Sequence, residues 1–364
     1  MKKIFIAILC LVNTSCASSK AWQMYKSDPN HSGYTQSNSV KSLNPKSSKV
    51  FTFKTKAPVV SSPAIFQDKI FFGSIDKTFY VLDLKTFKEL WRIATDNAIF
   101  SSPAVNENNV YFASGNIIYA VNIQTGNISW TFKTQGGKIY SSPTLVENIL
   151  YVGSSDNKIY AIDANKGDLI WKYSSTGKKS ISTPAYSDKV LYFGSEDKYL
   201  YAIDTVDNGK EKWRFPTQGP VSIPSIMNNS IFFGSDDGIF YSVNVQNGKE
   251  RWRFKSGGPI IGSPALSNEI VYFGSWDGNL YALDIRNGLL IWKYRTSGPV
   301  TGSPIVIKDN VCFGSWDKKL YCLDPRNGAK KEEFLTEDTV STPIAIDNHI
   351  LFGSWDNNFY MIKD

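Results

Sequence analysis

Histidine and cysteine are scarce in this chain of 364 residues. Its two histidines, His31 and His349, make a histidine-rich metal site or a triad with a histidine base a weak expectation. No two of its four cysteines are adjacent, and Cys10 and Cys16 lie near the amino terminus. After the first residues, no apolar stretch is long enough to cross a bilayer as a helix. The sequence therefore does not favour a metal enzyme, a histidine-dependent hydrolase or a membrane-spanning protein.

Aromatic residues, glycine and proline are abundant instead. Tryptophan, tyrosine and phenylalanine make up 14% of the chain, beside 26 glycines and 16 prolines. This mixture is typical of short strands and tight turns. The net charge of +7 comes mostly from scattered lysines, which indicates a solvated surface. Because no basic stripe runs among stacking aromatics, nucleic acid is not an expected partner.

The first 17 residues have the pattern of an export signal. Two lysines precede a nine-residue apolar run at positions 4–12, which has the length of a signal-peptide core. Cleavage before Cys16 would leave a lipidated cysteine, as in bacterial lipoproteins, whereas cleavage after Ala17 would release a soluble protein. Asn13 stands where the lipoprotein pattern usually has leucine. We expect an exported protein that is either anchored by lipid on Cys16 or released.

A motif of a small residue followed by proline recurs eight times at a spacing of about 40 residues. Such a period indicates a solenoid or a propeller. The segments between the prolines alternate or run β-branched and aromatic, so we interpret them as strands. The prolines are Pro63, Pro103, Pro143, Pro184, Pro224, Pro264, Pro304 and Pro343.

The sixth copy shows how each repeat is built. Strands are predicted at 263–266, 270–275, 280–284 and 289–295, separated by turns that contain Asp, Asn or Gly. Four antiparallel strands in about 40 residues make one propeller blade. The sequence therefore predicts an all-β, eight-bladed β-propeller.

The last copy has only three predicted strands. The segment 50–53 lies before Pro63 at the spacing where other copies carry their fourth strand. We expect this amino-terminal segment to supply the outer strand of the eighth blade, which closes the ring and removes its free edges. Residues 21–364 are predicted to form one such domain, a monomeric ring.

A tryptophan ends an eleven-residue pattern once in each of six copies. The pattern has a small residue, then Asp or Asn, then Gly, then Trp, as in Ala282, Asp284, Gly288 and Trp292. A repeated position indicates a repeated structural role, so we predict packing between blades. The seventh copy has a glutamate there, and Phe51 takes the place for the eighth. The six are Trp91, Trp130, Trp171, Trp213, Trp252 and Trp292.

Cys312 and Cys322 are the cysteines of the folded part. They fall on adjacent strands of one predicted hairpin, and a register difference of one residue decides whether they face each other. We expect two small buried residues that replace Tyr and Ala of the repeat; a disulfide is the alternative.

One turn position varies around the ring. This position lies between Ser and Asp in the turn that follows the second strand. In the last three copies it is a tryptophan: Trp276, Trp316 and Trp355. An arc of exposed aromatics on one face suits a peptide segment or a glycan. The alternative is that each indole packs against a neighbouring loop, such as residues 298–299, and is structural.

The repeats resemble the pyrroloquinoline-quinone (PQQ) repeat family. The resemblance rests on the run from Ala282 to Trp292, the preceding Phe-Gly-Ser-Trp-Asp-Gly at 273–278, and the opening Trp-Gln-Met-Tyr at 22–25 with His-Ser-Gly at 31–33. It covers nearly the whole mature chain and implies a propeller. The family has a dehydrogenase branch and a non-catalytic branch that includes BamB, the lipoprotein of the outer-membrane-protein assembly machine.

The resemblance to the non-catalytic branch implies a function in binding. The dehydrogenases need calcium, a catalytic base, an adjacent-cysteine disulfide and long insertions, whereas here the aspartates recur at turn positions, as in Asp156, Asp197, Asp237 and Asp277. We therefore expect no enzyme activity and no cofactor. The expected function is a protein-binding scaffold of the periplasm, lipid-anchored to the outer membrane and docked on an insertase. A secreted glycan-binding propeller is the alternative, and a PQQ-dependent dehydrogenase a remote one.

Overall fold

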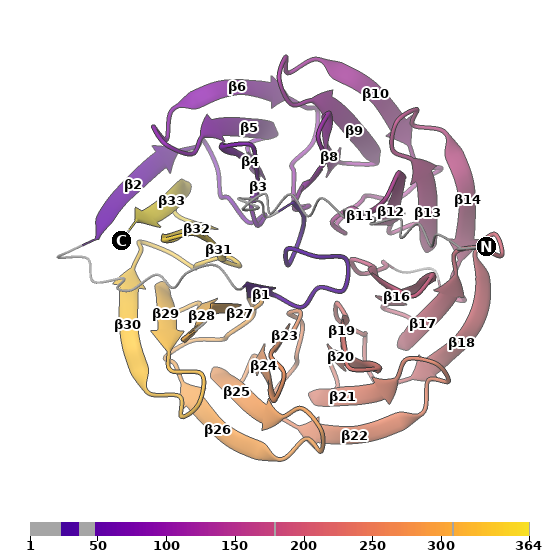
Figure 1. Cartoon of the computed structure of the whole chain (residues 1–364), viewed down its shortest axis with the longest axis vertical. Coiled ribbons are helices and arrows are strands. Elements are labelled where there is room, and N and C mark those ends of the chain that lie inside the picture. The colour runs from indigo at the N-terminus through magenta and orange to yellow at the C-terminus, as the bar shows by residue number, and fades with distance from the viewer. Residues whose placement is uncertain (1–22, 36–47, 178–179, 308, 364) are drawn as a thin grey trace, which may run out of the picture.

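Eight sheets, seven of four strands and one of five, are arranged radially around one axis (Figure 1). The computed structural model describes residues 23–35, 48–177, 180–307 and 309–363. Within each sheet four strands pair antiparallel in order from the axis to the rim, and the fifth strand of one sheet pairs in parallel at its inner edge. The all-β, eight-bladed propeller predicted from the 40-residue period is confirmed.

The first four blades follow the chain. Blade 1 comprises β3 (Ala64–Phe66), β4 (Lys69–Gly73), β5 (Thr78–Asp83) and β6 (Glu89–Ala94). Blade 2 comprises β7 (Ala104–Val105), β8 (Asn109–Ser114), β9 (Ile117–Asn122) and β10 (Ile128–Lys133). Blade 3 comprises β11 (Thr144–Val146), β12 (Ile149–Gly153), β13 (Lys158–Asp163) and β14 (Leu169–Ser174). Blade 4 comprises β15 (Ala185–Ser187), β16 (Val190–Gly194), β17 (Tyr199–Asp204) and β18 (Lys210–Pro216).

The last four blades include the two amino-terminal strands. Blade 5 comprises β19 (Ser225–Met227), β20 (Ser230–Gly234), β21 (Ile239–Asn244) and β22 (Glu250–Lys255). Blade 6 comprises β23 (Ala265–Leu266), β24 (Ile270–Gly274), β25 (Asn279–Asp284) and β26 (Leu290–Arg295). Blade 7 comprises β27 (Ile305–Ile307), β28 (Asn310–Gly314), β29 (Lys319–Leu323) and β30 (Lys330–Leu335), with β1 (Tyr34–Thr35) at its inner edge. Blade 8 comprises β31 (Ile344–Ile346), β32 (His349–Gly353), β33 (Asn358–Lys363) and β2 (Lys49–Lys54).

Burial changes across each blade from the axis to the rim. The second and third strands are almost wholly buried, as in β24 and β25, because neighbouring blades cover both of their faces. The outer strand β26 alternates between exposed and covered residues. Continuous apolar runs and alternating runs in the sequence thus correspond to inner and outer strands.

The amino-terminal strand closes the ring. β2 pairs antiparallel with β33, with Phe51 opposite Met361. The strand predicted at 50–53 is confirmed and extends one residue farther at each end. The outer edge of β33, the last strand of the chain, is thereby paired.

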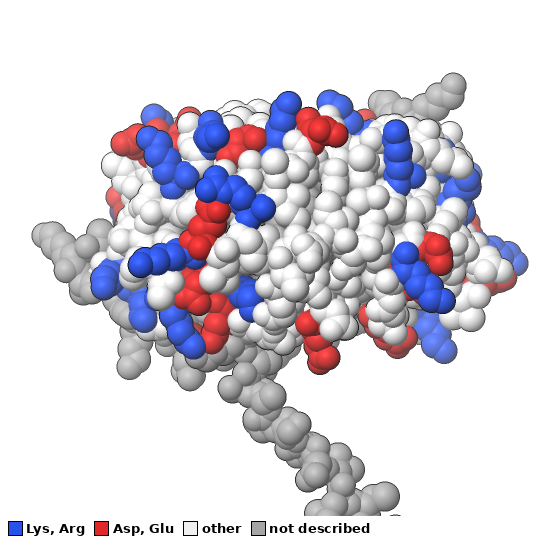
Figure 2. All heavy atoms as spheres, turned by 90° about the horizontal axis from the view of Figure 1, so that it is seen from above, with Lys and Arg blue, Asp and Glu red and all other residues white. Residues whose placement is uncertain are grey.

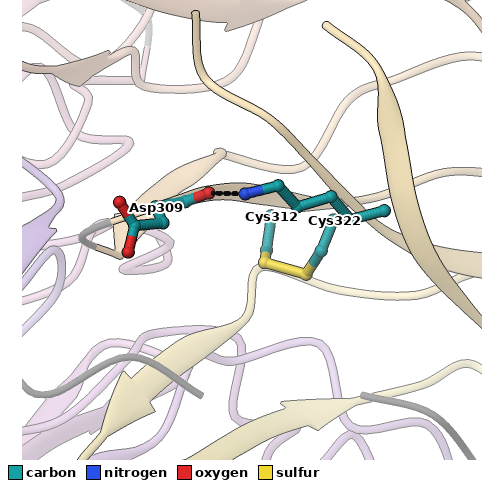
Figure 3. The surroundings of a disulfide bond; sticks show 4 residues. Asp309, Cys312 and Cys322 are labelled. Atoms are coloured by element: carbon teal, nitrogen blue, oxygen red, sulfur yellow. Dashed lines mark hydrogen bonds between the residues drawn. A yellow bond between two sulfur atoms is a disulfide. The ribbon is translucent and has the colours of Figure 1, made fainter. Parts of the chain in front are cut away.

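A disulfide joins Cys312 on β28 to Cys322 on β29 (Figure 3). The two residues lie directly opposite each other in the register of the hairpin, and both are buried. The preferred expectation of two unbonded buried residues is therefore wrong, and the alternative is correct. Directly before β28, the backbone oxygen of Asp309 accepts a hydrogen bond from the Lys331 ammonium.

The centre of the ring holds a feature that the sequence did not predict. Residues 23–33 lie across the axis, drawn in indigo in Figure 1, and lead into β1, which pairs in parallel with β27. The central channel is therefore filled by the protein's own chain at this level.

Candidate functional site

One face of the disc carries the turns between second and third strands together with the loops that connect consecutive blades. Because the strands of a blade are antiparallel, these two sets of connections lie on the same side; we call it the turn face. Backbone hydrogen bonds join them: the Trp276 N–H donates to the Pro259 oxygen, and the Trp316 N–H to the Pro299 oxygen, both at 3.0 Å. The turns are thus fixed to the loops beside them.

Three tryptophans stand on this face at neighbouring blades. The exposed fractions of Trp276, Trp316 and Trp355 are 41%, 46% and 48%. The rings of Trp276 and Trp316 are 5.0 Å apart between centroids and inclined by 57°. The structure therefore brings the first two into contact and leaves all three about half exposed.

The loops beside the arc contact the backbone and the Cβ atoms of the tryptophans. A Cβ on Gly298 would lie 3.3 Å from the Cβ of Trp316, so the loop packs on the start of that side chain. The Trp316 Nε1–H donates to the Thr301 hydroxyl at 2.7 Å. The backbone of the arc is thus anchored, while the three tryptophan side chains stay about half exposed.

The aspartate that follows each of these turn positions holds its turn rigid. Asp277 accepts hydrogen bonds from the Tyr281 hydroxyl at 2.6 Å and from the Gly257 N–H at 2.7 Å. Burial and the bond to Asp277 raise the pKa of Tyr281 to about 12. The same Asp–Tyr bond at four-residue spacing occurs in seven blades. The pairs are Asp76–Tyr80, Asp156–Tyr160, Asp197–Tyr201, Asp237–Tyr241, Asp277–Tyr281, Asp317–Tyr321 and Asp356–Tyr360.

A hollow of about 280 Å³ opens on the turn face over blades 3 to 6. Its lining includes the carboxylates of Glu196 and Asp236, with Tyr140 and Ile261. Burial raises the pKa of Asp236, and the charges of Asp237 and Glu196 raise it further. Glu196 and Asp236 occupy the same turn position as the three tryptophans, so one position of the repeat makes an acidic sector beside an aromatic one.

Further apolar side chains are exposed on the connecting loops of this face. Phe100 and Tyr140 are exposed by 39% and 48%, and their rings meet edge to face at a centroid distance of 5.5 Å. Ile261 is exposed by 40%. These residues belong to no motif of the sequence; the signal for them is a large apolar residue two places before the repeated Ser-Pro.

Six further tryptophans of the described residues lie between blades. Each indole packs on the glycine of the next blade's turn between third and fourth strands, where a Cβ would lie 2.5–3.2 Å from the ring. The Trp292 Nε1–H also donates to the Pro325 oxygen of blade 7 at 3.0 Å. The pairs are Trp91–Gly126, Trp130–Gly167, Trp171–Gly209, Trp213–Gly248, Trp252–Gly288 and Trp292–Gly328.

Candidate metal sites and membrane-spanning helices are absent from the part of the chain that the structure describes. Within residues 23–35, 48–177, 180–307 and 309–363, no three His, Cys, Asp or Glu side chains are grouped so that they could hold a metal ion. In the same part of the chain, no helix has the length and apolar character needed to cross a bilayer. Cys16, the predicted lipidation site, lies outside the described residues.

Comparison with solved structures finds the same architecture at low sequence identity. The computationally designed Ika8 protein matches with a TM-score of 0.76 and 16% identity, over 85% of this chain and 98% of that one. BamB from Moraxella catarrhalis matches with a TM-score of 0.71 and 15% identity, over 86% and 98%. Quinohemoprotein alcohol dehydrogenase from Comamonas testosteroni matches with a TM-score of 0.80 and 13% identity, over 96% and 81%. These likenesses establish the fold.

The family is established by sequence. No curated protein sequence matches the chain. The family described as "Outer membrane protein assembly factor BamB" matches residues 36–184, 139–223 and 175–363, which together span nearly all of the repeats. The chain belongs to this BamB family of PQQ-repeat β-propellers.

Proposed function

We propose that the protein is a non-enzymatic scaffold of the bacterial envelope that binds a partner of outer-membrane-protein assembly, such as the insertase, through its turn face. The observation that carries the proposal is the arc of three half-exposed tryptophans on one face of a BamB-family ring. Clustered, exposed aromatic side chains are the usual anchors of protein interfaces.

The rigidity of the arc supports binding. The backbone bonds to the loops and the Asp277–Tyr281 clamp fix the turn that carries Trp276 before any partner arrives. A preorganised surface loses little conformational entropy on association. The carboxylates of the adjacent hollow suit basic residues of the partner at the edge of the contact.

An oxidising compartment is consistent with the disulfide. Buried disulfides are stable in the periplasm and outside the cell, and are rare in the cytosol. The family and the Cys312–Cys322 bond therefore support an extracytoplasmic location. We propose the periplasm, with a lipid anchor on Cys16 at the outer membrane.

The turn aspartates support a role without catalysis. In seven blades the carboxylate accepts a hydrogen bond from the hydroxyl of a tyrosine of its own blade, as Asp277 does from Tyr281. These groups are used to hold turns. The family fold also serves catalysts, as the likeness to an alcohol dehydrogenase illustrates, so oxidation of alcohols with added PQQ and calcium is the assay that would contradict this assignment.

The main test is crosslinking and mass spectrometry on intact membranes with three forms of the protein. Wild type should crosslink to an outer-membrane assembly component. The double variant Trp316→Ala, Trp355→Ala should lose that crosslink and keep its melting temperature, because both rings are half exposed. Leu289→Ala is the matched control, since Leu289 is 67% exposed in a turn of the opposite face. Retention of full binding by the stable double variant would refute the site.

The same preparation tests the anchor. The proposal expects an amino-terminal peptide that begins with a diacylglyceryl-modified Cys16. An unmodified terminus near Ser18, with no envelope partner, would instead favour a secreted protein.

A glycan-binding propeller is the second candidate. The observation in its favour is that the Trp276 and Trp316 rings form an exposed, angled pair on which a sugar ring can stack. Saccharide quenching of tryptophan fluorescence that disappears in Trp316→Ala would favour it over the assembly role.

A further inference from the structure

The segment that fills the centre of the ring is held by equivalent groups of five blades. Its backbone oxygens accept hydrogen bonds of 2.8–2.9 Å from the inner strands of blades 2, 4, 5, 6 and 7. The acceptor and donor residues are Gln23 and Val105, Pro29 and Tyr186, Asn30 and Ile226, Ser32 and Leu266, and Gly33 and Val306.

The donors are a product of the repeat. Each is the second residue after the repeated proline, as Val105 is after Pro103 and Val306 after Pro304. An innermost strand has one neighbour in its own blade, so its other edge presents N–H groups toward the axis. Unpaired strand edges are templates for binding another polypeptide segment. The ring therefore presents a circle of donors by its own symmetry.

The segment is shaped to meet that circle. It is a compact loop in which the Asp28 carboxylate accepts from the Ser32 N–H at 3.2 Å and the Gly33 N–H donates to the Lys26 oxygen at 3.3 Å. Lys26, Ser27, His31 and Gly33 all have positive φ angles. These internal bonds satisfy the N–H groups of Ser32 and Gly33 within the loop, while the backbone oxygens of the same two residues accept hydrogen bonds from the blades.

Three buried side chains add contacts that are not repeated around the ring. The Tyr25 hydroxyl lies 2.6 Å from the Ser303 hydroxyl, and the Lys26 ammonium donates to the Pro304 oxygen. The His31 Nδ1 lies 3.2 Å from the Pro224 oxygen. Tyr25, Lys26 and His31 are 7%, 1% and 0% exposed. These contacts lie in blades 5 and 7 and set the orientation of the loop in the circle.

We propose that the inner rim of the ring is a peptide-binding site and that residues 23–35, which we call the axial clasp, are its resident ligand. The site takes a compact polypeptide loop that presents carbonyl oxygens outward and carries a buried cationic side chain. The clasp binds a ring whose donors are already in place and ties five blades together. This inference does not depend on the proposed envelope function.

The test separates the clasp from the ring after folding. A protease recognition sequence is inserted between Ser39 and Val40 of the full chain, and the folded protein is then treated with the protease until cleavage is complete. The amino-terminal fragment should remain with the ring through gel filtration. It should then exchange with a fluorescent synthetic peptide of residues 23–35 at a measurable rate. Immediate loss of the fragment on cleavage would overturn the proposal.

Matched variants show whether retention uses the contacts described. In Gly33→Ala the new Cβ would lie 2.5 Å from the Lys26 ammonium at a φ of +61°, so exchange should be at least about tenfold faster. Gly136→Ala is the control, because a Cβ there has no atom within 4 Å. Tyr25→Phe removes one hydrogen bond and should speed exchange about fivefold. Equal exchange rates in all four proteins would overturn the proposal.

Discussion

The joints between blades are of two kinds. From blade 1 to blade 7, each of six joints places a tryptophan on the turn glycine of the next blade, as Trp292 does on Gly328. From blade 7 to blade 8 and from blade 8 to blade 1, this arrangement is absent from the described residues: Glu332 and Phe51 stand in place of the tryptophans. Where the repeat supplies the contact, the joints are alike; where the two ends of the chain meet, the contacts are individual.

In blade 7, other residues take the place of all three residues that form the tryptophan contact in blade 6. In blade 6, Tyr272, Ala282 and Trp292 lie opposite one another on successive strands, and both Tyr272 and Trp292 donate to the Pro325 oxygen of the next blade. In blade 7 the corresponding line is Cys312, Cys322 and Glu332. Blade 8 joins β33 to β2 by pairing rather than by a turn, so no equivalent turn oxygen stands there to receive an indole.

The joint between blades 8 and 1 is formed by phenylalanine side chains. Phe51 packs on Phe87, which takes the turn position that is glycine in the next blades and has a φ of +57°. Phe359 also packs on Phe87, at a centroid distance of 5.9 Å. Where the repeat is interrupted, a disulfide within blade 7 and aromatic contacts between blades 8 and 1 thus stand in place of the tryptophan–glycine contact.

The largest effect is expected at a repeated joint. Trp292→Ala should lower the free energy of unfolding by about 3–5 kcal/mol, because it removes a buried indole and leaves a cavity between blades 6 and 7. Phe51→Ala should cost about 2 kcal/mol, since Phe51 is only partly buried. Urea unfolding of both variants measures the contrast. An unchanged melting temperature in Trp292→Ala would refute the packing role.

The disulfide should come next. Its loss should cost about 3 kcal/mol, the value expected for closing a loop of about ten residues. Thermal melts with and without a strong reductant measure this cost in wild type. The variant Cys312→Ala, Cys322→Ala should melt early in both conditions. If complete reduction leaves the melting temperature of wild type unchanged, the Cys312–Cys322 bond does not contribute to stability.

A smaller effect is expected from acidification of the axial clasp. Burial lowers the pKa of His31 to about 3, so between pH 6.5 and 3 the unfolded imidazole binds a proton that the folded one does not. Stability should therefore fall as pH drops, by about 2 kcal/mol at pH 5. Burial lowers the pKa of Lys26 to about 7, which acts in the same direction, whereas the raised pKa of Asp28 acts in the opposite one.

The measurement is urea unfolding at pH 7.5 and pH 5 in wild type and in His31→Gln. The variant should lose most of the difference between the two pH values. An equal loss of stability in both proteins would place the titration elsewhere in the ring.

The repeated parts of the fold were predictable because the same proline, turn and strand patterns recur in successive copies. Eight prolines, the turn aspartates and the strand patterns agree with one another, so an error in one copy is corrected by the others. The closure by residues 50–53 followed from counting strands. The state of Cys312 and Cys322 did not follow, because their pairing depends on a register that alternation alone leaves one residue uncertain.

The axial clasp and the acidic hollow were harder to foresee. The clasp occurs once, so no second copy reveals its role, and its bonds join Gly33 to Val306 and Ser32 to Leu266 across most of the chain. Glu196 and Asp236 stood at the same variable turn position as the tryptophans, yet only the ring geometry shows that they line one hollow. The two sectors of the turn face share one sequence signal.

The pairing of β2 with β33 imposes an order on synthesis. Thr55 donates to the Asn357 oxygen, a partner 302 residues away. At about 5–20 residues per second, the amino-terminal strand waits roughly 15–60 s for that partner to be made. Throughout that time the ring is open and β2 is an unpaired strand. Because this partner lies 302 residues after Thr55, the ring can close only once all eight blades have been synthesised.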